Sequence, residues 1–114
     1  MKSIISASTL FLLVSASAVL AHSKSETMPA DGETVASLET ISMEFDKPMR
    51  VTAFTLSKSG ETLATDSEQG TDMVSQYQAM PESALAPGDY LVEWRGLSQD
   101  GHPMQGEFSF TISE

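Results

Sequence analysis

The chain has 114 residues, which is enough for one small domain. It carries 16 acidic and 6 basic residues, a formal net charge of −10, so nucleic acid and anionic membrane surfaces are poor partner candidates. The absence of cysteine excludes disulfide bonds, thiolate metal sites and cysteine nucleophiles.

The N-terminal segment has the pattern of a secretory signal peptide. Lys2 supplies a positive charge, the stretch 4–20 is apolar and rich in small residues, and Ala21 suits the position before a cut. Serine and threonine interrupt the apolar stretch, and its dense part is too short for a membrane anchor. We therefore expect cleavage after Ala21, with a cut after Ala18 as the competing possibility.

Cleavage at that point divides the chain into two parts. Residues 1–21 are the expected signal peptide, and residues 22–114 are the expected exported domain. The mature chain then begins at His22. No linker or internal repeat divides the rest into further domains.

The mature part shows short alternating apolar and polar runs, which favour an all-β fold. In chain order we expect a short first strand before a turn at 28–32, then strands at 41–45 and 51–58. A hairpin return at 62–65 and a loop at 66–72 should follow. The last expected strands are at 73–80, at 90–95 and through Phe108, Phe110 and Ile112. About seven short strands in this length predict a small β-sandwich.

The segment before the 90–95 strand carries a specific turn signal. Pro87-Gly88 suits a turn in which glycine takes a positive φ. The spacing of Leu85, Pro87, Gly88 and Tyr90 is similar to the tyrosine corner of Greek-key sandwiches, in which the phenol bonds back to nearby backbone. Trp94 alternates in phase with Tyr90, which predicts a core position for it.

Both histidines of the mature chain have unusual positions. As an N-terminal residue, His22 offers its α-amine and its imidazole Nδ1, which together close one six-membered chelate ring on a metal ion. An internal histidine cannot do this because its backbone nitrogen is an amide. Amines and imidazoles of this kind titrate near neutral pH, so a metal displaces their protons at little cost. The alternative is that histidine stands at the cleavage site by chance.

His102 lies in the run 99–103, two residues after Asp100. In extended backbone this spacing puts both side chains on the same side, and Pro103 restricts the backbone of His102. Together with His22, the set is three nitrogens and one oxygen, and such tetragonal coordination suits Cu(II). The predicted metal ligands are therefore His22, Asp100 and His102. For His102 alone, the alternative is a loop histidine bonded to a neighbour.

The methionines are scattered, and core packing is their usual role. Thioethers select Cu(I) when two or three lie together. Only Met49 and Met104, in or beside expected loops, form a plausible pair. We therefore expect no Cu(I) site and keep this pair as the alternative.

A long combined motif extends from Leu85 to Ile112. It consists of Leu85, Gly88, Tyr90, Val92, Trp94, Ser98, Asp100, His102, Pro103, Gly106 and Phe110. With His22, Lys24 and the run 29–32, these residues make nearly all of the mature chain resemble the CopC family of periplasmic copper-resistance proteins.

The resemblance implies a Greek-key β-sandwich, immunoglobulin-like or cupredoxin-like, that carries Cu(II) in the periplasm for copper homeostasis, resistance or delivery. It implies that His22, through amine and imidazole, and His102 are equatorial ligands, with Asp100 weaker or axial. It also implies a CopD-like inner-membrane partner. The methionine-rich Cu(I) loop of some members is not matched, because residues 46–57 hold only Met49.

We therefore expect a non-enzymatic, mostly monomeric copper-binding protein. One alternative is an oxidative enzyme of the histidine-brace type, since lytic polysaccharide monooxygenases also use an N-terminal histidine with a second histidine. The short chain and the extra carboxylate of Asp100 argue against it. The other alternative is a metal-free sandwich module for assembly or adhesion.

Overall fold

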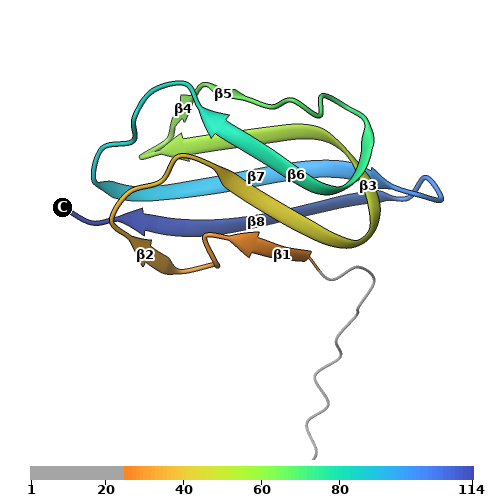
Figure 1. Ribbon diagram of the computed structural model, residues 1–114, viewed down its shortest axis with the longest axis horizontal. Coiled ribbons are helices and arrows are strands. Elements are labelled where there is room, and N and C mark those ends of the chain that lie inside the picture. The colour runs from red at the N-terminus through yellow and green to blue at the C-terminus, as the bar shows by residue number, and fades with distance from the viewer. Residues whose placement is uncertain (1–24) are drawn as a thin grey trace, which may run out of the picture.

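The structure is a computed structural model that describes residues 25–114 (Figure 1). The expected signal peptide and His22 lie outside these residues. The described part is all-β, as predicted, with eight strands: β1 (Ser25–Met28), β2 (Glu33–Val35), β3 (Ile41–Lys58), β4 (Glu61–Leu63), β5 (Thr65–Asp66), β6 (Met73–Pro81), β7 (Gly88–Ser98) and β8 (Pro103–Ile112). Within it, no helix has the length and apolarity needed to cross a membrane.

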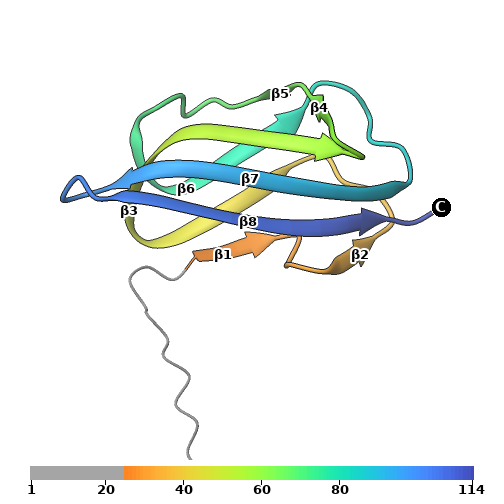
Figure 2. The same cartoon turned by 180° about the vertical axis from the view of Figure 1, so that it is seen from behind.

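Strand β3 connects two layers of a curled mixed sheet. Its first part pairs with β1 and β6, and its last part pairs with β7 and β4. The order along the sheet is β2-β8-β7-β3-β6-β5, and only the β2–β8 pairing is parallel. Figures 1 and 2 show the two layers from opposite sides, with β3 passing from one to the other. The prediction of separate strands at 41–45 and 51–58 was wrong, because the chain stays in strand conformation between them.

Strand β3 has two irregularities, and the second of them changes which side chains face the core. The pairing register shifts between Glu44 and Met49, and again between Val51 and Ala53. The buried residues before the second shift are Ile41, Met43, Phe45, Met49 and Val51, with Lys47 exposed among them, whereas Leu56 is the buried residue after it. A β-bulge inserts one residue into a strand and so reverses the alternation beyond it. The bulged part of β3, between Glu44 and Met49, lies at the first shift, and Lys47 within it is exposed.

The core lies between the two layers and is entirely apolar among the described residues. The predicted alternation is confirmed in β7, where Tyr90, Val92 and Trp94 are buried, and in the buried aromatic residues of β8. The rings of Phe45 and Trp94 meet edge to face, with centroids 5.4 Å apart, and so connect the layers. The indole lies over Gly106, where a Cβ would come 2.7 Å from its Nε1. Glycine is therefore required opposite Trp94.

The predicted tyrosine corner is present before β7. The hydroxyl of Tyr90 donates to the carbonyl of Ala86 at 2.5 Å, and Gly88 adopts a φ of 146°. Lys58 Nζ donates to the carbonyl of Pro87 at 2.9 Å. These bonds fasten the connection into β7 and fix the strand that leads to the site at its far end.

Candidate metal centre

The turn that connects β7 to β8 contains both of the predicted site residues that the structure describes. Gly101 N–H donates to the carbonyl of Ser98, and Ser98 N–H donates to the carbonyl of His102, each at 2.9 Å. Gly101 has a φ of 86°, a left-handed conformation that glycine adopts without a steric penalty. The local sequence therefore closes a tight turn that projects from the end of the sheet.

Asp100 and His102 are in direct contact across this turn. The Nδ1 atom of His102 lies 3.1 Å from Oδ2 of Asp100. Ser98 Oγ donates to Oδ1 of the same carboxylate at 2.5 Å and accepts the N–H of His102 at 3.1 Å. The side chains of His102 and Asp100 remain 74% and 71% exposed, so a solvated ion has access to both.

The reason for this proximity differs from the one that the sequence suggested. Asp100 and His102 were expected on one side of an extended backbone. The structure instead places them in a turn, outside the ladder between β7 and β8, and the turn itself brings their side chains together. The sequence pattern contained Ser98, but no chemical role was expected for it.

Hydrogen bonds stabilise the ionised form of Asp100. The hydroxyl of Ser98 is the main cause that lowers the pKa of the Asp100 carboxyl below its ordinary value of 3.8, and the hydrogen bond from His102 adds to this effect. Because the side chain of Asp100 is 71% exposed, desolvation opposes these bonds only weakly. The site therefore presents a negative charge throughout the neutral pH range.

A groove of about 670 Å³ adjoins this turn. Its lining comes from the bulged part of β3, from the turn and from the start of β8: Lys47, Pro48, Met49, Ser98, Gln99, Asp100, His102, Pro103 and Met104. The structure thus brings Met49 and Met104, the pair considered from the sequence, to the same groove as His102. Met49 is only 1% exposed and packs in the core cluster.

The first described strand begins at the same end of the molecule. Ser25 pairs with Phe45, two residues before Lys47 of the groove. Figures 1 and 2 both show the start of β1 in the half of the molecule from which the β7–β8 turn projects. Among residues 25–114, no three histidine, aspartate or glutamate side chains gather as a metal site. Asp100 and His102 therefore need further donors to complete a coordination sphere.

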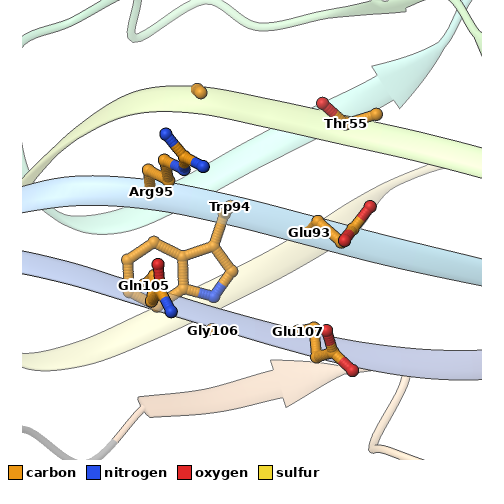
Figure 3. Close-up of a pocket in the computed structure, with 8 residues that line it drawn as sticks. Thr55, Glu93, Trp94, Arg95, Gln105, Gly106 and Glu107 are labelled. Atoms are coloured by element: carbon orange, nitrogen blue, oxygen red, sulfur yellow. The ribbon is translucent and has the colours of Figure 1, made fainter.

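A second hollow, of about 690 Å³, lies on the outer face of β3, β7 and β8 (Figure 3). Glu93 and Glu107 face each other across β7 and β8, and Arg95 pairs with Gln105 in the next row. The residues that line this hollow include no histidine, and the positive charge of Arg95 lies beside the two carboxylates. The hollow is a less suitable metal site than the β7–β8 turn.

The curled eight-stranded mixed sheet is a CopC-like β fold. Residues 24–113 match the CopC domain, and the chain belongs to the CopC family.

Individual relatives agree with this assignment. Copper resistance protein C of Xanthomonas campestris pv. juglandis is 30% identical over 115 residues, a match that covers 88% of this chain and 86% of that protein. Copper resistance protein C of Escherichia coli is 42% identical over 33 residues, and this match spans only 26% of its length.

Solved structures share the fold. The crystal structure of PcoC, a methionine rich copper resistance protein from Escherichia coli, superposes with a TM-score of 0.65 at 26% identity, covering 77% of this chain and 94% of that one. CopC from Methylosinus trichosporium OB3b gives a TM-score of 0.69 at 24% identity, covering 81% and 94%.

Membership of the family has functional consequences. It implies copper binding, and CopC copper-binding proteins are not enzymes, which disfavours the oxidative-enzyme alternative. Members of the family are typically periplasmic.

Proposed function

We propose that this protein is a periplasmic carrier or buffer that binds one Cu(II) ion through His22, His102 and Asp100. The observation that supports the proposal best is the contact between His102 Nδ1 and Asp100, in an exposed turn that shares a groove with Lys47. The turn supplies an imidazole and a carboxylate. Tetragonal nitrogen and oxygen coordination, which suits Cu(II), requires more nitrogen than this turn holds.

His22 is the proposed source of the missing nitrogens. Cleavage of the signal peptide 1–21 gives it a free amine beside its imidazole. Two residues lie between His22 and Ser25, so the three steps from one Cα to the next give a maximal reach of roughly 10 Å. Since Ser25 pairs next to the bulged part of β3, this reach is consistent with His22 meeting His102 at the groove.

Copper is the cargo in this proposal, and the protein performs no chemistry on it. His102 supplies one imidazole nitrogen, and Asp100 supplies negative charge as a weaker ligand or from outside the coordination sphere. An exposed site suits a protein that passes its ion on, and a CopD-like inner-membrane protein is the proposed recipient. Met49 and Met104 line the same groove, but Met49 is buried in the core, so the proposal includes no separate Cu(I) site.

Copper titration of two chains tests the role of the terminal amine. One chain begins at His22 and the other retains Ala21 before it. We expect one Cu(II) per chain for the first, with several nitrogen couplings in its electron paramagnetic resonance spectrum. Retaining Ala21 turns the amine into an amide, so we expect affinity to fall on the order of 100-fold, about 2.7 kcal/mol.

The matched control adds one alanine after Glu114 to the chain that begins at His22, and its affinity should not change. Trp94, the single tryptophan, provides a fluorescence signal for the titration. Equal affinity with and without Ala21 would remove His22 from the site. Equal and weak binding by wild type and His102→Ala would favour the metal-free module instead.

A further inference from the structure

We propose that Ser98 is a positioning residue of the copper site, which sets the orientation and the tautomer of His102 before the metal arrives. The inference rests on the proposed function, because it concerns how the same site is prepared. Its basis is a single hydroxyl with two hydrogen bonds: Ser98 Oγ donates to Asp100 and accepts from the backbone of His102.

Ser98 is well placed to anchor the turn. It is the last residue of β7, where it is half-buried and pairs with the buried Met49 of β3. Asp100 and His102 lie beyond the strand and are about three-quarters exposed. Each exposed side chain loses rotational entropy when a metal fixes it. Bonds to a residue in the sheet reduce that loss, because they restrict the side chains in advance.

The second effect concerns which imidazole nitrogen is free. Asp100 Oδ1 accepts the hydroxyl of Ser98, and this directs Oδ2 toward Nδ1 of His102. An ionised carboxylate can accept hydrogen bonds but cannot donate them, so Nδ1 of His102 must carry the proton in this contact. In the neutral ring Nε2 then holds the free lone pair. Histidines that bind metals usually donate their other N–H to a carboxylate or carbonyl in this way, which orients the ring and increases its basicity.

Three variants of the chain that begins at His22 test the inference. Ser98→Ala removes both hydrogen bonds of the hydroxyl. Ser98→Thr keeps the hydroxyl, and threonine is a residue that is common in β-strands. Ser83→Ala is the control, because Ser83 is an exposed serine in another turn. The first measurement uses metal-free protein: imidazole nitrogen shifts in NMR spectra report the tautomer of His102. We expect the Nδ1–H tautomer in wild type, Ser98→Thr and Ser83→Ala, and a mixture of tautomers in Ser98→Ala.

The second measurement is Cu(II) affinity with the accompanying resonance spectrum. Changes to residues that orient metal ligands typically cost about 10–100-fold in affinity. We expect a loss in that range for Ser98→Ala, with restoration by threonine. An unchanged tautomer and affinity in Ser98→Ala would overturn the inference, as would a loss that threonine fails to restore. If wild type binds no copper, the proposed function fails, and the metal-free spectra still decide whether Ser98 controls His102.

Discussion

His102 combines high exposure with a defined contact. An exposed histidine ordinarily samples several rotamers, yet here Nδ1 lies against Asp100 and the backbone N–H is bonded to Ser98. These two contacts, with Asp100 and with Ser98, restrict the orientation of the imidazole ring and leave it exposed to solvent. A site of this kind stays accessible to an ion in solution and still offers ordered donor atoms.

The charge of Asp100 leads to a testable prediction at this scale. Carboxyl-carbon NMR of metal-free protein should give a titration midpoint for Asp100 below its ordinary pKa of 3.8. Because Ser98 is the largest cause of the lowering, Ser98→Ala should raise the midpoint toward that value. A midpoint at or above 3.8 in wild type would contradict the hydrogen bonds described for the turn.

The sign of the effect on stability follows from the lowered pKa. The folded state favours the ionised carboxylate more than the unfolded chain does, so the stabilisation is fully present above the unfolded value. It disappears as the pH falls through the lower folded value. Any weakening of copper binding between pH 8 and 5 must therefore come from protons on nitrogen ligands and not from Asp100.

The sequence predicted part of this residue-scale arrangement. The spacing of Asp100 and His102 and the adjacent glycine and proline were sufficient to predict that the two side chains lie together. The contribution of Ser98 was missed because a serine at the end of a strand has no distinctive pattern. Its role depends on how the turn closes, and turn closure is a property of backbone geometry that spacing alone does not specify.

Among the elements, β3 shows most clearly what periodicity predicts and what it misses. The alternation of Ile41, Met43 and Phe45 correctly predicted a half-buried strand. Periodicity fails where the register shifts, because a bulge breaks the two-residue repeat while the backbone stays extended. The polar residues near Lys47 therefore resembled a loop. They lie in the strand, at the point where β3 leaves one layer for the other.

The outer face of β7 and β8 allows a prediction about strand pairing. Glu93 and Glu107 are directly opposite and exposed (Figure 3), and like charges in that position repel. Glu107→Lys should replace the repulsion with attraction and stabilise the protein by about 0.5 kcal/mol. Urea unfolding of the variant beside wild type measures the change.

The control for this prediction is Glu82→Lys, which makes the same change of charge at an exposed turn residue outside the strands. It should have a smaller effect. If both variants stabilise the protein equally, the gain comes from the lower net negative charge of the molecule and not from the cross-strand pair.

At the scale of the whole molecule, the apolar core and the β7–β8 turn are separate. The core contains no buried polar or charged residue among those described, and the Ser98–Asp100–His102 network lies at one end. Substitutions in the turn should therefore change binding with little effect on folding. The all-β class and most core positions were predictable from sequence, since alternation reports burial directly.

Copper should raise the melting temperature of the chain that begins at His22 by a limited amount. A ligand at 100 times its Kd that binds only folded protein adds about 2.7 kcal/mol, or roughly 10–20 °C for a domain of this size. His22 keeps both of its nitrogens in the unfolded chain, so the unfolded state binds copper as well. The expected shift is positive but smaller than that range.

Calorimetry with and without Cu(II) measures this shift, and His102→Ala is the comparison. In the proposed site, that variant keeps the donors of His22 and loses the one imidazole that folding would bring to them, so its shift should be close to zero. A similar rise in both proteins would mean that copper stabilises the fold without His102.

The shared strand β3 also determines how the molecule comes apart. Its first part completes one layer and its last part completes the other, so neither layer has a full set of strands without it. If β6 separates from β3, the core side chains of β7 and β8 become exposed to water. If β7 separates from β3, the core side chains of β6 become exposed in the same way. We therefore expect melting to be an all-or-none event, in which the β7–β8 turn persists or disappears together with the rest of the domain.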